Sequence, residues 1–274
     1  MLAAMSLSRP PVAALRPFVE LIWACEAAAP KAAPARELVL PTGALHLVVR
    51  LDDAPLRIFR DATDAGGLSL RHAVIGGARA APYVKDIARP VPTIGALLRP
   101  GAAGLLVGAP AGVLTGAHWA LADLWGAAAV ESLRDRLAAV ASPASRLAIF
   151  EAALLARLPR PARLDPRIAH ALAQIPEGAP VATVAADCGL SHRHFTARFH
   201  EAVGLTPKAW ARVRRFGRAL DRLAAEPVIA WADLAAAEGY ADQAHFIREF
   251  RALAGLSPGG YRRCAPAAPR HVPL

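Results

Sequence analysis

Cysteine is scarce in this sequence. Its three cysteines, Cys25, Cys188 and Cys264, lie far apart, and no C-x-x-C pair occurs. This spacing supplies neither a zinc-ligand pair nor a disulfide framework, and it is typical of proteins from a reducing compartment. We therefore expect a cytoplasmic protein without a zinc site or disulfides.

Long apolar runs are also missing. No stretch of about 18 uninterrupted strongly apolar residues is present, and the run over residues 102–113 is short and broken by glycine and proline. The first residues lack a basic segment followed by an apolar run, so no signal peptide is expected. We expect no membrane partner.

Acidic residues are outnumbered by basic ones. The chain has 22 Asp and Glu against 32 Lys and Arg, which gives a net charge of +10. A basic chain favours a polyanionic partner, and nucleic acid is the first candidate. The excess is spread along the whole chain, so charge alone does not locate a site. The length of 274 residues allows one or two domains.

Motifs of the common enzyme classes are missing as well. No G-x-S-x-G elbow, P-loop or Rossmann fingerprint occurs. His46, His72 and His118 lack the spacing of a metal-binding cupin, and for His46 a partly buried, hydrogen-bonded role is favoured. The pair His192 and His194 opens a predicted helix, where a DNA-facing or packing role is favoured over metal binding. We expect no enzyme, no catalytic residue, no metal and no cofactor.

The first half of the chain has the pattern of β-strands. Short apolar runs separated by turn residues occupy 18–25, 37–40, 45–51, 56–59, 73–75 and 93–98. Four aromatic residues here are candidates for lining a pocket, although core packing is the favoured role: Trp23, Tyr83, Trp119 and Trp125.

The second half has the pattern of helices. Helical periodicity covers about 104–158, and it resumes after the proline-rich segment 159–164, which reads as a linker. The fold class is therefore α+β. A β-rich domain with trailing helices is expected over 1–158, an all-α domain over 165–264 and a disordered tail over 265–274.

The all-α part contains an internal repeat. Six residues of the first copy match six of the second at one constant offset: His194, Phe195, Phe199, Gly204, Leu205 and Pro207 against His245, Phe246, Phe250, Gly255, Leu256 and Pro258. Each copy has an alanine-rich helix, a turn with glycine and a second helix capped by Ser191 or Asp242. The two phenylalanines of each second helix lie one turn apart and face inward. Each copy therefore predicts a helix-turn-helix unit.

The opposite face of each second helix is the one that would enter a major groove. At about 100° per residue, this face carries Arg193, Ala197 and His200 in the first copy. In the second copy it carries Ala244, Arg248 and Arg251, with His245 at its edge.

A basic helix is predicted between the copies, from Thr206-Pro207 to about Ala225. Its basic residues are Lys208, Arg212, Arg214, Arg215, Arg218 and Arg222. A rigid connector of this kind would fix the spacing of two reading heads, and successive major grooves lie ~34 Å apart. We expect phosphate contacts, which position a protein without reading sequence, from Lys208, Arg212, Arg215 and Arg251.

The repeat resembles the AraC/XylS family of bacterial transcription regulators. The resemblance covers residues 165–263 and is strongest over 239–262, from Gly-Tyr-Ala-Asp-Gln to Gly-Gly-Tyr-Arg. It implies two recognition helices in adjacent major grooves on one face of bent DNA. The implied base-contacting positions are Arg193, Thr196, Ala197, Gln243, Ala244, His245 and Arg248. Ala197 departs from the larger polar residue usual there, so distinctive reading is expected mainly from Arg193, Thr196 and His200.

The first half is similar to a companion domain found on some members of that family. The segments that carry this similarity are 17–23, 40–48, 75–77 and 98–104. The resemblance implies a sensory or dimerisation role and names no ligand.

Three hypotheses follow. The favoured one is a sequence-specific transcription factor modulated by a small-molecule effector in the N-terminal domain, which would act through unequal affinity for two conformations. In the second, the N-terminal domain serves assembly alone. The third is a β-barrel enzyme fused to a helical module, and the missing catalytic cluster counts against it. A homodimer, a contact with RNA polymerase, the effector and the operator all stay open.

Overall fold

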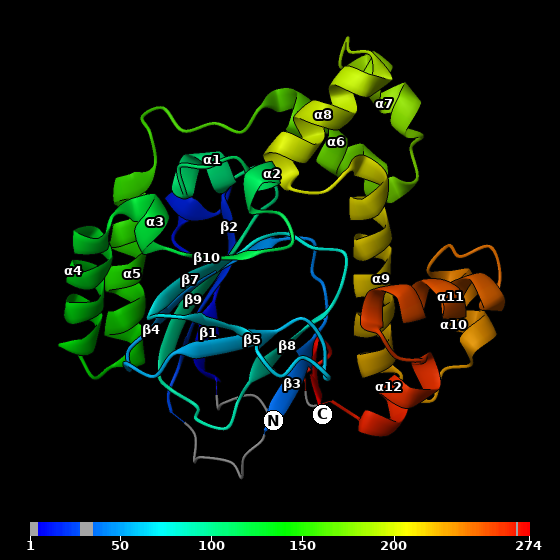
Figure 1. Ribbon diagram of the computed structural model, residues 1–274. Helices are drawn as coiled ribbons and strands as arrows, with labels where there is room; N and C mark the ends of the chain where they lie inside the picture. The colour runs from blue at the N-terminus through cyan, green and yellow to red at the C-terminus, as the bar shows by residue number, and fades with distance from the viewer. Residues whose placement is uncertain (1–4, 28–34, 267) are drawn as a thin grey trace.

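The computed structural model describes residues 5–27, 35–266 and 268–274. In this range the N-terminal part is built from two antiparallel sheets flanked by helices, and the C-terminal part is helical (Figure 1). The observed fold class is the α+β class that the sequence predicted.

The larger sheet has the strand order β1-β2-β9-β4-β7-β10. Its strands are β1 Met5–Arg9, β2 Val19–Cys25, β9 Thr93–Leu98, β4 Leu45–Arg50, β7 Ala73–Gly76 and β10 His118–Ala120. The smaller sheet has the order β11-β3-β8-β5-β6. Its strands are β11 His271–Pro273, β3 Arg36–Val39, β8 Tyr83–Asp86, β5 Leu56–Phe59 and β6 Leu68–Leu70. All six predicted strands are present, whereas β1, β6, β8, β10 and β11 were not predicted.

Side-chain alternation gives the larger sheet two different faces. Leu45, Leu47 and Val49 on β4 are fully buried, and α5 (Pro143–Arg157) packs against the same sheet at β2. His46 and Val48 point to the opposite face and are only half-buried. The sheet therefore has one sealed apolar face and one face with polar side chains.

Helices follow the strands as the sequence predicted for residues 104–158. They are α1 Ala103–Leu106, α2 Ala111–Leu114, α3 Ala122–Trp125, α4 Ala127–Ala138 and α5. Strand β10 interrupts this series because it pairs with the edge of β7. That pairing is a long-range contact, which a local helical pattern does not report.

The C-terminal part contains the helices α6 Pro166–Gln174, α7 Val181–Asp187, α8 His192–Val203, α9 Pro207–Ala225, α10 Trp231–Ala237, α11 Gln243–Ala254 and α12 Pro258–Cys264. Five of these helices, α6, α8, α9, α11 and α12, begin where the sequence predicted. The side chain before each of five helices accepts a hydrogen bond from a first-turn N–H: Asp165, Ser191, Thr206, Asp242 and Ser257. Such caps satisfy N–H groups that the helix itself leaves unpaired.

The prediction of a disordered tail over 265–274 was wrong. Strand β11 pairs antiparallel with β3, and Arg270 Nη1 donates to Asp221 Oδ1 at 2.9 Å. The Tyr261 hydroxyl donates to the carbonyl of Pro269 at 2.7 Å. Figure 1 shows the end of the chain, in red, beside β3. The open edge of the smaller sheet supplies the hydrogen bonds that order this segment. Ala267 lies outside the described residues.

Candidate DNA-binding interface

Two helix pairs, α7–α8 and α10–α11, have the same construction. Phe195 and Phe199 on α8 are fully buried, as are Phe246 and Phe250 on α11. The turns between the paired helices place Gly189 at φ +66° and Gly239 at φ +72°, a region that favours glycine. The repeat in the sequence therefore corresponds to two helix-turn-helix units.

Helix α9 carries part of the core of both units. Trp210 near its start contacts Phe199 with ring centres 5.8 Å apart, and Phe216 contacts Phe250 at 5.2 Å. The helix has 19 residues, which corresponds to a length of about 28 Å. Helices α8 and α11 are thus both packed against the single helix α9 (Figure 1).

The outward face of α11 is open to solvent. Gln243, Ala244, Arg248 and Arg251 are exposed. His245 is half-buried, and its Nδ1 accepts a hydrogen bond from the backbone N–H of Ala241 at 3.2 Å. Because Nδ1 accepts, the Nε2 of the neutral ring carries the proton and is available as a donor.

The outward face of α8 is open only in part. Arg193 and Ala197 are exposed. Thr196 is half-buried, and its hydroxyl is inaccessible and makes no hydrogen bond with a described residue. His200 is half-buried as well. Among the α8 positions predicted to contact bases, Arg193 is exposed and can form hydrogen bonds, whereas the exposed Ala197 has no polar side-chain group.

Three of the six basic side chains of α9 form ion pairs with acidic residues of the second unit. Arg212 forms a two-pronged pair with Glu249, with Nε–Oε2 at 2.6 Å and Nη2–Oε1 at 2.8 Å, and this hydrogen bonding raises the pKa of Arg212. Arg218 and Arg222 donate to the buried carboxylate of Glu238 at 3.1 and 2.9 Å. These pairs fasten the second unit to α9, so a phosphate role for Arg212 is not supported.

The remaining basic residues of α9 have no carboxylate partner among the described residues. Lys208 and Arg214 are exposed, and Arg215 is half-buried with its guanidinium 5.2 Å from the ring centre of Tyr240. These side chains are free to meet a phosphate backbone.

Family models match both halves of the chain. Residues 184–264 match a model described as a helix-turn-helix domain. The C-terminal part of this chain is an AraC-type DNA-binding domain. The predicted resemblance is thereby confirmed for this AraC-type domain, and residues 8–120 match a model described as a domain of unknown function, DUF6597.

Several solved structures are similar to the chain or to its AraC-type domain. ToxT from Vibrio cholerae is 7% identical with a TM-score of 0.46, over 90% of this chain and 98% of that one. The C-terminal domain of AraT, a response regulator from Geobacillus stearothermophilus, is 22% identical with a TM-score of 0.34, over 37% of this chain and 88% of that one. The DNA-binding domain of AdpA, a global transcriptional factor solved with a target DNA, is 28% identical with a TM-score of 0.32, over 35% of this chain and 90% of that one. No curated protein sequence matches the chain.

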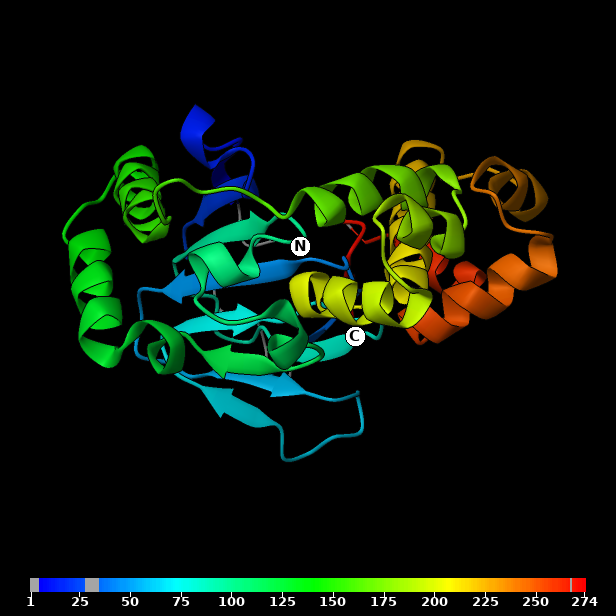
Figure 2. The ribbon, with the colours of Figure 1, turned by 90° about the horizontal axis from the view of Figure 1, so that it is seen from above.

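The N-terminal domain docks on α8 of the AraC-type domain. The Thr115 hydroxyl donates to the carbonyl of Gly204, just after α8, at 2.5 Å. Gly112 on α2 lies so close to His200 that a Cβ there would be 2.9 Å from its Nδ1. Figure 2 shows α8, in yellow, lying along the N-terminal domain. The sequence did not reveal this contact, which explains why the predicted reading residue His200 is partly covered.

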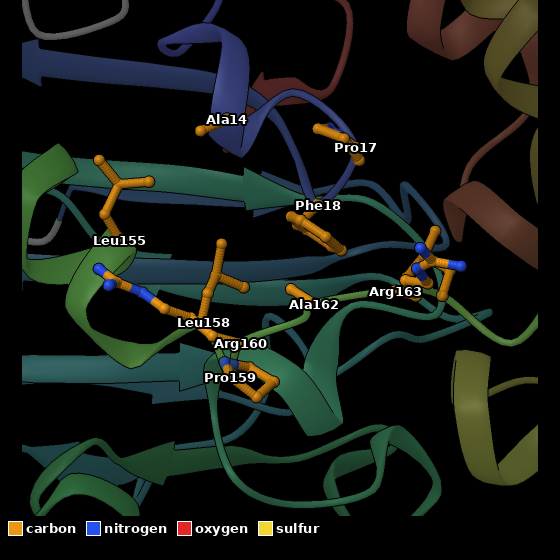
Figure 3. Close-up of a pocket in the computed structure, with 10 residues that line it drawn as sticks. Ala14, Pro17, Phe18, Leu155, Leu158, Pro159, Arg160, Ala162 and Arg163 are labelled. Atoms are coloured by element: carbon orange, nitrogen blue, oxygen red, sulfur yellow. The ribbon is translucent and has the colours of Figure 1, made fainter.

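An open groove of about 670 Å³ lies where the linker leaves the N-terminal domain. Pro17 and Phe18 line one side, Leu155 of α5 and Leu158 just after that helix line another, and the linker contributes Arg163 (Figure 3). None of the residues that line the groove lies on α8 or α11.

Within the described ranges, no three His, Cys, Asp or Glu residues are grouped so that they could hold a metal ion. None of the helices in those ranges is both long and apolar enough to cross a bilayer.

Proposed function

We propose that this DNA-binding transcription regulator reads a specific sequence by inserting α8 and α11 into successive major grooves on one DNA face. The observation that carries the proposal is that both helices pack on α9. Helix α9 is about 28 Å long, which is comparable to the ~34 Å between successive major grooves. Exposed arginines, Arg193 and Arg248, stand on the two outward faces.

The second unit exposes more of its proposed base-reading side chains than the first unit does. The Arg248 guanidinium has the fork geometry for the O6 and N7 atoms of guanine, and the Gln243 amide suits adenine. Arg193 would read a base from α8. Thr196 and His200 can take part only after their surroundings change, because both are partly covered as described above.

Phosphate contacts would come from Lys208, Arg214, Arg215 and Arg251. These residues combine a positive charge with the absence of a carboxylate partner among the described residues. Their role would be to position the protein on the duplex and to make binding dependent on salt.

We further propose that the N-terminal domain controls access to α8. Its Thr115 and Gly112 contact the end of that helix, so a docked arrangement hinders insertion into DNA. An effector would regulate binding only by a difference in affinity between the docked and the released arrangement. The proposed units are residues 1–158 and 165–264, joined by 159–164. Homodimerisation and a contact with RNA polymerase stay predictions.

The test is selection of bound sequences from a random duplex library with the full-length protein at near-physiological salt. We expect a motif with two blocks about one helical turn apart. The same selection with Arg248→Ala should lose preference in one block only. Binding without any enriched motif, which disappears as salt rises, would contradict sequence-specific reading.

A further inference from the structure

A cluster of polar side chains stands between the two sheets of the N-terminal domain. His46 on β4 and His118 on β10 both pair with Gly76 of β7, so they lie on the same face of the larger sheet. A Cβ on Gly76 would lie 3.3 Å from the His118 ring, which therefore leans across the missing side chain. Tyr83 of the smaller sheet meets the edge of His118 with ring centres 4.6 Å apart.

Arg79 occupies the centre of this cluster. Its Nη2 donates to His118 Nδ1 at 3.0 Å and to the carbonyl of Ala117 at 3.3 Å. Its guanidinium lies 4.3 Å from the ring centre of Tyr83. We call His46, Arg79, Tyr83 and His118 the Arg79 cluster; all four side chains are half-buried rather than sealed from solvent.

The hydrogen bonding of Arg79 fixes the state of His118. A guanidinium can only donate, so His118 Nδ1 must accept and the proton of the neutral ring sits on Nε2. Burial, followed by the charges of Arg79 and His46, lowers the pKa of His118 from 6.5 to about 3. The Nε2–H of His118 and the hydroxyl of Tyr83 have no hydrogen-bond partner among the described residues, which leaves two donors beside the guanidinium.

The charges around the cluster do not cancel. Lys85 is paired with Glu37 at 3.0 Å, and His271 bonds the same carboxylate. Arg270 is paired with Asp221 at 2.9 Å. Arg79 has no carboxylate partner anywhere in residues 5–27, 35–266 and 268–274, and desolvation by burial lowers its pKa. A partly buried cation without a counter-charge is costly to the folded protein, and a bound anion would remove that cost.

We propose that the Arg79 cluster binds a small monocarboxylate. One uncompensated guanidinium matches one negative charge, and its planar fork matches the two carboxylate oxygens. His118 Nε2–H and the Tyr83 hydroxyl would add donors. Val48 and Leu97 lie on the same sheet face as His46, because Val48 is two residues along β4 and Leu97 pairs with His46 on β9. These two half-buried apolar side chains suit a short hydrocarbon tail.

This site lies in the N-terminal domain, and its proposal does not depend on DNA reading. The test is therefore isothermal titration of the full-length protein without DNA. The probes are butyrate and butyramide, which have nearly the same shape and differ in charge. We expect butyrate to bind and butyramide to bind at least about tenfold more weakly, because only the acid forms charge-assisted hydrogen bonds. Equal binding of the two probes, or no binding of butyrate up to millimolar concentration, overturns the proposal.

A variant assigns the binding to Arg79. Arg79→Met should lower the affinity for butyrate about ten- to a hundredfold. Arg136→Met is the matched control, because Arg136 is exposed on α4 of the same domain and has no carboxylate partner among the described residues; its affinity should not change. Thermal unfolding without ligand checks that each variant is folded. If Arg79→Met does not fold, Arg79→Lys replaces it, since lysine keeps the charge without the fork. Unchanged affinity in the variant that folds overturns the proposal.

Discussion

The hydroxyl of Thr115 donates a hydrogen bond to the backbone carbonyl of Gly204, which ties the N-terminal domain to the end of α8. Gly204 has φ +86° and caps that helix in the left-handed conformation. The bond therefore engages a carbonyl at a helix end, where orphan acceptors are found. A substitution of Thr115 can therefore be used to weaken the contact between the N-terminal domain and α8.

Thr115→Val should release α8 in part, because valine keeps the shape of threonine and cannot donate. A lost hydrogen bond costs about 0.5–1.5 kcal/mol, so the affinity for the selected DNA should rise about two- to tenfold. Fluorescence anisotropy with labelled duplex measures this change. Thr63→Val, in an exposed loop of the same domain, is the control. A fall in affinity for Thr115→Val would mean that docking helps DNA binding.

Arg248→Ala should reduce specific binding by about 1–3 kcal/mol and relax the preference at one base pair. The comparison is Arg251→Ala on the same helix, which should weaken binding to all sequences alike. Competition between the selected site and its single-base variants separates the two behaviours. A uniform loss for Arg248→Ala would remove that residue from the base-reading set.

Arg215→Ala should weaken binding to every sequence and reduce the slope of log affinity against log salt by about one unit. Arg215 stacks on Tyr240 and has no carboxylate partner in the described part of the chain, so its charge is available to a phosphate. Titrations at several salt concentrations give the slope. If the slope stays at the wild-type value, Arg215 makes no phosphate contact.

Arg212→Ala should act on stability instead. The Arg212 side chain is 37% exposed, so water screens its pair with Glu249, and we expect a loss of about 1 kcal/mol in the free energy of unfolding. Arg214→Ala, on the same helix but exposed and unpaired among the described residues, should leave stability unchanged. Urea unfolding compares the two. A reduced salt slope for DNA binding in Arg212→Ala would return this residue to the phosphate contacts.

The attachment of the tail should depend on pH through Glu37. Burial alone would raise the pKa of this carboxyl, but the hydrogen bond from His271 and the charge of Lys85 outweigh burial and lower it from 4.5 to about 2. A carboxyl with a lowered folded-state pKa stabilises the fold above its unfolded pKa, and this contribution is lost as the pH falls through the folded one. The stability difference between the wild type and Glu37→Gln should therefore be constant above about pH 5 and shrink between about pH 4.5 and 2. A difference independent of pH in that window would contradict the assignment.

Local patterns in the sequence predicted the parts of the fold that local chemistry determines. Helix α9 begins after Thr206 and ends at Ala225, as predicted, because a capping hydroxyl, a proline and periodic apolar residues act within a few residues of one another. The same reasoning predicted that α8 and α11 begin after Ser191 and Asp242. It assigned Arg212 to phosphate because a count of basic residues does not show that Glu249 lies opposite.

The parts that were missed depend on contacts between distant segments. His46 and His118 were read as separate residues, and only the shared register with Gly76 brings them together. Tyr83 was read as core packing, although it stacks with Arg79, which no motif marked. The docking of α2 on α8 and the pairing of β11 with β3 likewise join segments that are far apart in the sequence.

The pairing of β11 with β3 has a topological consequence. The polypeptide leaves the N-terminal domain through the segment 159–164, forms all the helices from α6 to α12, and then returns to complete the smaller sheet. The DNA-binding part is therefore inserted into the N-terminal domain and is connected to it at both of its ends, not by a single linker. A separation of α8 from α2 would therefore have to turn the helical part about the two points where it joins the N-terminal domain. Such a constraint would limit the directions in which α8 and α11 could move relative to the N-terminal domain.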